Sequence, residues 1–170
     1  AALIEALALL RKQDGTEDGG AQGLNVGLAI VGSGVLEATL RARIDSLGLS
    51  GHVALLGQMD NPFPVLGGAD LFVLPSLHEG QPVTLLEAMT LGTGVVASDL
   101  PGNRELVDLG YGVLSGTSPQ DIAQAIRTAL ADPRLAHGEF DVTEHNARSL
   151  RDTLEAVLGP ESLQQQPKGK

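Results

Sequence analysis

Short apolar runs and longer amphipathic stretches alternate along the chain. The apolar runs are bounded by glycine, proline or polar residues and lie at 25–31, 52–57, 70–75, 94–98 and 112–114. Runs of this length and composition predict buried β-strands. Apolar positions at helical spacing predict helices at 1–12, 35–47, 62–68, 82–91, 104–107 and 119–130, and a last one at 138–158.

This order of elements predicts an α/β fold. Strands that are apolar throughout must be covered on both faces, and helices between successive strands produce parallel pairing with right-handed crossovers. We therefore expect a Rossmann-like doubly wound parallel sheet with helices on both faces, in a single domain. The domain covers residues 1–158, the polar and glycine-rich residues 13–24 form an exposed loop, and residues 159–170 form a disordered tail.

Composition narrows the classes of function. The 170 residues carry a net charge of −10, which repels a phosphate backbone, so we expect no nucleic-acid partner. The chain has no cysteine, which excludes a disulfide framework and a thiolate metal cluster and favours a cytoplasmic location. No apolar run reaches the roughly 18 residues that span a bilayer.

The turn Gly32-Ser33-Gly34 is a first candidate for ligand binding, because it follows an apolar run and precedes a predicted helix. The missing side chains would let a ligand approach the backbone and the first amides of the helix. Glu37 stands where the third glycine of the dinucleotide fingerprint belongs, and a carboxylate there opposes a pyrophosphate. A nicotinamide or flavin enzyme is therefore disfavoured, and an ordinary turn is the alternative interpretation.

The loop after the run 70–75 is richer in chemistry. It reads Ser76-Leu77-His78-Glu79-Gly80-Gln81, and Pro82 suits the first turn of the next helix. Backbone amides at such a helix start bind anions, and the candidates here are Gly80, Gln81, Val83 and Thr84. Glu87, farther along the helix, can accept two hydrogen bonds from a vicinal diol such as a ribose.

Each of these residues also has a plainer interpretation. Glu79 suits a helix start because of the helix dipole, and Glu87 and Thr84 could be ordinary surface residues. The neighbours of Glu87 are all apolar: Leu85, Leu86, Ala88 and Met89. A charge buried in such a stretch needs a partner, which favours the binding interpretation.

Taken together, Glu79-Gly80-Gln81-Pro82 and Leu85-Leu86-Glu87-Ala88-Met89 resemble the donor-binding domain of the retaining group 1 glycosyltransferases of the GT-B fold. That family has two glutamates with the spacing of Glu79 and Glu87. Further matches follow in order at 31–34, 56–57, 91–93 and 95–99, so that the resemblance covers roughly residues 1–130.

The resemblance implies a C-terminal domain that binds a nucleoside-diphosphate sugar, and a reaction that retains the anomeric configuration. By position, Glu79 would be the catalytic residue at the donor sugar and Glu87 would hold the ribose. The diphosphate would be cradled by Gly80, Gln81, Pro82, Val83 and Thr84. The remaining donor-binding positions would be Gly32, Gly34, Gly57, Gln58 and His78, with Gln58 against the base and His78 either touching the sugar or shaping the loop. No cofactor and no protein-bound metal are implied, since the nucleotide-sugar is the substrate.

The chain departs from the family pattern in three ways. The Arg and Lys that neutralise the diphosphate, just upstream of the first helix, are absent, and so is the N-terminal acceptor domain. Gly94 stands where the family often has proline. We therefore expect a fragment, lacking an initiator Met, that folds but does not transfer sugar alone. The full enzyme would be cytoplasmic, with peripheral association at the inner face of the membrane left open.

Other functions were weighed. A non-catalytic nucleotide-binding or interaction module on the same fold is the main alternative, because a fold does not fix a function. An epimerase would need a His/Asp pair that the sequence does not offer. A phosphorylase would need a pyridoxal lysine, and none of Lys12, Lys168 and Lys170 suits a pocket. The histidines lack the spacing of a metal site, and Arg104 is the nearby cation worth testing.

Overall fold

A computed structural model describes residues 1–12, 24–80, 82–108 and 112–136 of the chain. Contacts divide the chain into two units, Ala1–Gly138 and Glu139–Lys170, and every described residue belongs to the first. The predictions for the loop at 13–23, for Gln81, for the helix at 138–158 and for the tail lie outside the described residues.

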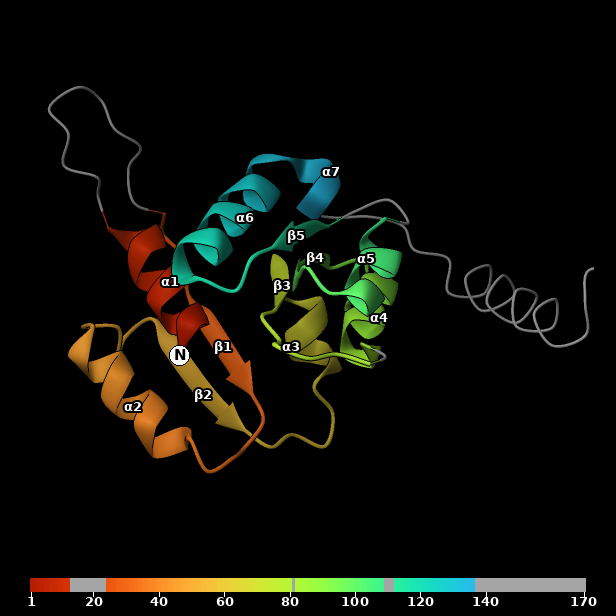
Figure 1. The fold of residues 1–170 in the computed structure, drawn as a ribbon. Helices are drawn as coiled ribbons and strands as arrows, with labels where there is room; N and C mark the ends of the chain where they lie inside the picture. The colour runs from red at the N-terminus through yellow and green to blue at the C-terminus, as the bar shows by residue number, and fades with distance from the viewer. Residues whose placement is uncertain (13–23, 81, 109–111, 137–170) are drawn as a thin grey trace, which may run out of the picture. The chain divides into compact units, whose positions relative to one another are not determined.

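Helices and strands alternate along this first unit (Figure 1). The elements are α1 (Ala2–Arg11), β1 (Leu28–Val31), α2 (Glu37–Ser46), β2 (Val53–Gly57), α3 (Phe63–Gly67), β3 (Leu71–Leu74), α4 (Val83–Thr90), β4 (Gly94–Ser98), α5 (Pro101–Val107), β5 (Val113–Ser115), α6 (Pro119–Ala131) and α7 (Pro133–Ala136). The expected alternation is present. Helix α5 begins three residues earlier than predicted, because Pro101 starts the helix instead of a turn.

All of the strand pairs are parallel, as the sequence predicts for an α/β fold, and the strands are divided between two sheets. One sheet pairs β1 with β2, and the other has the order β3-β4-β5. In register, Ala29 lies opposite Ala54, and Val73 lies opposite Val96. The outer strands of both sheets, β1, β2, β3 and β5, carry no charged residue.

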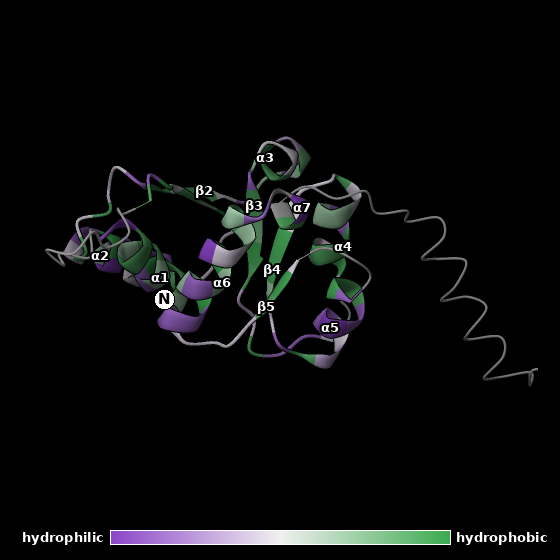
Figure 2. Cartoon of the chain, turned by 90° about the horizontal axis from the view of Figure 1, so that it is seen from above, coloured by the Kyte–Doolittle hydropathy of each residue, from purple (hydrophilic) through white to green (hydrophobic). Residues whose placement is uncertain are grey.

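Strand β4 is the most deeply buried strand of the described residues. Every residue from Gly94 to Ser98 is buried. Figure 2 shows β4 in the hydrophobic colour, with α6 on one side and α4 and α5 on the other. Helices therefore cover both faces of this sheet, and the burial explains why the β4 sequence is apolar with no alternation. Strand β1, in contrast, alternates half-buried and exposed residues.

Helix α1 contributes to two parts of the hydrophobic core. Ala6 and Leu10 pack in a cluster with β4 and α6, whereas Ile4 and Leu7 pack in a second cluster with α2. Val26, just before β1, is partly buried against both clusters. Each large apolar side chain buried in this way contributes about 1.5–3 kcal/mol. The two sheets thus share one helix as a common cover.

Helix α6 begins where the sequence predicts, because Ser118 caps it. The Ser118 Oγ accepts a hydrogen bond from the Asp121 amide at 3.1 Å, and Pro119 occupies the first turn. The predicted apolar stripe faces the core: Ile122, Ala123, Ile126 and Ala129 are buried, and Leu130 is half-buried. The cap therefore fixes where α6 begins, and the stripe packs against α1 and β4.

Candidate functional site

The loop between β3 and α4 holds Glu79 in a defined position. The Ser76 Oγ donates a hydrogen bond to the Glu79 Oε1 at 2.5 Å, and both residues are half-buried. A hydrogen bond to a carboxylate is stronger than one between neutral groups, so Ser76 orients the Glu79 side chain. Sequence reasoning missed this role, although a serine three residues before a glutamate in a loop is a recognisable signal.

The start of α4 is free of side-chain capping. Pro82 is the N-cap, with ψ of 72°, and no side chain caps the helix. The Pro82 carbonyl accepts hydrogen bonds from the amides of Leu85 at 3.0 Å and Leu86 at 3.2 Å. The amides of Val83 and Thr84 precede these bonded amides, and both residues are exposed. The helix start is thus open to an anion, as the sequence predicts, although Pro82 precedes the helix instead of beginning it.

Glu87 lies at the boundary between the core and the surface. Its neighbours Leu85, Ala88 and Met89 are buried, while Glu87 itself is half-buried. Its carboxylate makes no hydrogen bond or ion pair to a described residue. The apolar neighbours predict a buried charge at Glu87, but in the structure the residue is only half-buried. It is therefore available to a ligand without being an isolated buried charge.

The glycine loops after β1 and β2 lie against each other. The Gly32 amide donates a hydrogen bond to the Gly57 carbonyl at 2.7 Å. A Cβ atom added at Gly32, Gly34, Gly57 or Gly80 would meet nothing within 4 Å, so the space beside each is open. Gln58 and His78 are exposed. Among the described residues, no hydrogen bond links the two glycine loops with residues 76–80, and a shared ligand stays a prediction.

The start of α5 packs against the Glu79 loop. A Cβ atom on Gly102 would lie 2.9 Å from the Gly80 carbonyl oxygen and 3.4 Å from the Pro82 Cδ. The next residue, Asn103, is fully buried, and its Nδ2 donates to the Ser98 carbonyl at 2.8 Å. No pattern in the sequence indicates the contact between Gly102 and this loop.

Arg104, the cation that the sequence singled out, is already paired. Its Nε and Nη2 both donate to the carboxylate of Asp99, with Nη2 2.9 Å from Oδ2. The hydrogen bonds from Arg104 lower the pKa of Asp99, and the same pair raises the pKa of Arg104. Arg104 would have to leave Asp99 to bind a phosphate directly.

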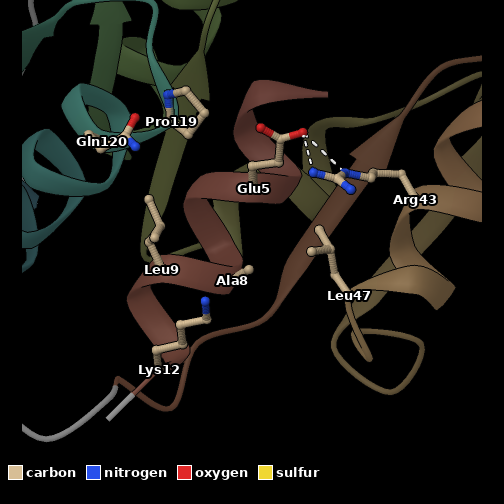
Figure 3. Close-up of a pocket in the computed structure, with 8 residues that line it drawn as sticks. All are labelled: Glu5, Ala8, Leu9, Lys12, Arg43, Leu47, Pro119 and Gln120. Atoms are coloured by element: carbon tan, nitrogen blue, oxygen red, sulfur yellow. Dashed lines mark hydrogen bonds and ion pairs between the residues drawn. The ribbon is translucent and has the colours of Figure 1, made fainter. Parts of the chain in front are cut away.

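Two hollows of the described surface lie away from the predicted donor residues. The first, of about 190 Å³, lies between α1, α2 and the start of α6 (Figure 3). Its walls are formed by Glu5, Ala8, Leu9, Lys12, Arg43, Leu47, Pro119 and Gln120, so Lys12 lines a hollow, contrary to the expectation from the sequence. A second, of about 150 Å³, lies beside α2 and β2. Neither hollow is lined by a predicted donor residue.

Two further findings concern only the part of the chain that the structure describes. No group of three or more His, Asp or Glu side chains there could hold a metal ion. In the same part of the chain, no helix has the length and apolar character needed to cross a membrane.

Comparison with protein families gives one match over most of the chain. The family described as glycosyl transferases group 1 matches residues 1–141. The amylovoran biosynthesis glycosyltransferase AmsK of Erwinia amylovora is 36% identical over 147 residues, which cover 82% of this chain and 33% of AmsK. The lipopolysaccharide core biosynthesis mannosyltransferase LpcC of Rhizobium leguminosarum is 36% identical over 104 residues, 59% of this chain and 30% of LpcC. The chain thus spans about a third of the length of these relatives.

Solved structures share the fold. Anabaena Alr3699/HepE, crystallised with UDP, superposes with a TM-score of 0.69 at 26% identity, over 91% of this chain and 44% of HepE. WaaG, a glycosyltransferase involved in lipopolysaccharide biosynthesis, superposes with a TM-score of 0.64 at 25% identity, over 79% of this chain and 35% of WaaG. Both are GT-B glycosyltransferases.

Proposed function

The chain belongs to the group 1 glycosyl transferases, and on that premise we propose that it is the donor-binding part of an enzyme that transfers a sugar from a nucleoside-diphosphate sugar to an acceptor, with retention of configuration. The loop between β3 and α4 carries this proposal, because it joins the Ser76–Glu79 hydrogen bond to an uncapped helix start. The acceptor-binding part belongs to the remaining length of a protein of the relatives' size.

The diphosphate binds at the start of α4. Val83 and Thr84 are exposed residues whose amides lie in the first turn of α4, and the space beside Gly80 is open. The helix end adds roughly half a positive charge, which stabilises an anion. Arg104 is already paired with Asp99. Among the described residues, the contacts with the diphosphate therefore come mainly from these backbone amides and only to a small extent from side-chain cations.

The two glutamates then contact the two ends of the donor. Glu87 is half-buried and unpartnered among the described residues, so its carboxylate can accept both ribose hydroxyls. Glu79, oriented by Ser76, faces the sugar. A carboxylate at that position stabilises the positive charge that develops at the anomeric carbon as the diphosphate leaves.

This chain alone does not transfer sugar. A diphosphate adds negative charge to a chain of net charge −10, and the amide contacts neutralise only part of it. Catalysis also requires a bound and oriented acceptor. Robust transferase activity of the 170 residues would contradict this part of the proposal.

We expect the enzyme to act in the cytoplasm, with peripheral contact at the inner face of the membrane. The cysteine-free sequence is compatible with a reducing compartment such as the cytoplasm. Fractionation of cells that produce the full-length protein would test it, and recovery outside the cytoplasm and membrane fractions would contradict it.

Calorimetric titration of the full-length gene product with UDP, GDP, ADP and CDP, and with their sugar forms, tests donor binding. UDP comes first because HepE was solved with it. Loss of a hydrogen bond to a charged group costs about 1.5–3 kcal/mol, so Glu87→Gln should weaken binding of the preferred nucleotide about 10- to 100-fold. Glu79→Gln should lower kcat with a smaller effect on nucleotide affinity. The exposed Glu105 of α5 provides the matched control, Glu105→Gln.

The alternative is a nucleotide-binding module without catalysis. It predicts that Glu87→Gln weakens binding while no donor and acceptor pair gives turnover. If none of the nucleotides binds the full-length protein, or if Glu87→Gln and Glu105→Gln behave alike, the donor-binding proposal fails.

A further inference from the structure

The contact between Gly102 and the Glu79 loop is closer than a side chain allows. A Cβ atom on Gly102 would lie 2.9 Å from the carbonyl oxygen of Gly80, a distance that real Cβ atoms essentially never show. The obstructing atom belongs to the main chain, so no change of rotamer relieves it. Gly102 lacks a positive φ, and its backbone conformation therefore accepts alanine. The need for glycine at this position comes from the contact alone.

Moving helix α5 away from the loop would break its interactions with β4. Asn103 is fully buried and its Nδ2 donates to the Ser98 carbonyl at the end of β4. The Asn103 Oδ1 is buried without a hydrogen-bond partner among the described residues. On the other side, Arg104 pairs with Asp99, the residue that follows β4. Since α5 is fixed to β4 by these interactions, an added methyl group would displace the loop more readily than the helix.

We propose that Gly102 is a positioning residue for donor binding, because it lets α5 support the Gly80 carbonyl and thereby sets the position of Glu79 and of the start of α4. The inference rests on the proposed function. Gly80 follows Glu79 directly, and Pro82, the N-cap of α4, also lies near the Gly102 position. A shift at Gly80 thus reaches the sugar end and the phosphate end of the site together. Displacements of about 1 Å in such sites can lower rates about 100-fold.

The sign of the change in stability distinguishes a role of Gly102 in positioning the loop from a purely local effect on α5. Without the contact, Gly102→Ala would raise the thermal midpoint of unfolding, because alanine is the better helix former. With the contact, the variant gains no stability and the loop shifts. The thermal midpoint and the donor kinetics therefore give independent readouts.

The test compares three alanine variants of the full-length gene product. Gly102→Ala is the probe. Gly68→Ala is the steric control, because its Cβ would lie 3.0 Å from the carbonyl oxygen of Pro64, which is also a main-chain atom but does not belong to the loop at 76–80. Gly51→Ala is the neutral control, since its Cβ would meet nothing within 4 Å. We expect Gly102→Ala to lower kcat/KM at least tenfold and to weaken binding of the preferred nucleotide, while both controls stay within twofold of the wild type.

A double-mutant cycle with Ser76→Ala adds a readout that a structural role would not change. If Gly102 acts through the Glu79 loop, the effects of Gly102→Ala and Ser76→Ala on kcat should not add. The inference is overturned if Gly102→Ala keeps wild-type affinity and kcat, if Gly68→Ala lowers them equally, if the cycle is additive, or if Gly102→Ala is unfolded by circular dichroism. Failure of the wild type to bind any nucleotide would instead refute the proposed function.

Discussion

Replacing Gly112 with alanine should be the most destabilising of three chosen glycine substitutions. Gly112 has φ of +131°, a conformation that side chains disfavour. Its added Cβ would lie 2.6 Å from the Val95 Cγ2 and 3.2 Å from the Val95 carbonyl oxygen. Val95 is fully buried in β4, the central strand of its sheet. The Val95 side chain therefore has little room to move away.

The expected magnitude follows from two contributions. A residue held in a sparsely populated backbone region costs about 1–3 kcal/mol. Inserting a methyl group into a well-packed interior costs about 1–3 kcal/mol more. Gly112→Ala should therefore lower the free energy of unfolding by about 2–6 kcal/mol, a large part of the ~5–15 kcal/mol that stabilises a typical domain.

Two other glycines separate these contributions. Gly48 has φ of +68°, but its added Cβ would meet nothing within 4 Å. Gly48→Ala should therefore cost only the backbone strain, about 1–2 kcal/mol. Gly51 has neither a positive φ nor a close neighbour, and Gly51→Ala should change the stability by no more than about 0.5 kcal/mol. The chain has no Trp and one Tyr, so urea unfolding is followed by far-ultraviolet circular dichroism.

The test depends on the order of the three variants in their free energies of unfolding. If Gly112→Ala costs no more than Gly48→Ala, the packing around Val95 is not as tight as the structure indicates. A double variant with Val95→Ala gives a second check, because it removes the Cγ2 contact and should show a favourable coupling with Gly112→Ala. An additive result would refute the side-chain part of the argument.

Two further predictions concern the C-terminal part of the described chain. Ser118→Ala removes the cap of α6 and should lower the free energy of unfolding by about 1 kcal/mol in the same urea assay, whereas Ser118→Thr keeps a hydroxyl that can accept from the Asp121 amide and donate to the Asp121 carboxylate, and should cost less; equal effects of the two variants would contradict the capping role. The carboxyl of Asp132 should titrate with a pKa of about 2, below its ordinary 3.8, because Arg134 donates hydrogen bonds to it. The lowered pKa means that this pair stabilises the fold above about pH 4 and that its contribution is lost as the pH falls through about 2. Titration followed by carboxyl NMR measures this pKa, and Arg134→Gln should return it toward 3.8; an unchanged midpoint in that variant would show that Arg134 is not the cause.

The sequence predicted the elements more reliably than their contacts. Strands such as Leu71–Leu74 are apolar runs between turn signals, and Ser118 marks a helix start, so local patterns locate them. The division of the strands between two sheets depends on pairing between distant segments, which no local pattern encodes. The early start of α5 was missed because Pro101-Gly102 is also typical of a turn.

In the candidate site, too, features set by neighbouring residues were predictable from the sequence, whereas features set by contacts between distant segments were not. The spacing of Glu79 and Glu87 and the open start of α4 follow from residues near each other in the sequence. The half-buried position of Glu87 depends on how α4 packs, and apolar neighbours alone overstated its burial. The support of Gly80 by Gly102 joins segments 22 positions apart, and only the folded backbone brings them together.

The uncharged outer strands have a consequence for how the chain behaves in concentrated solution. Copies with a net charge of −10 repel one another, and this repulsion is screened over a Debye length of about 10 Å at 0.1 M salt. Strand edges attract at contact, through backbone hydrogen bonds that screening weakens far less, and β1, β2, β3 and β5 have no charge to oppose such contacts. Added salt should therefore promote self-association of this chain, and its colloidal stability should be greatest in dilute buffer.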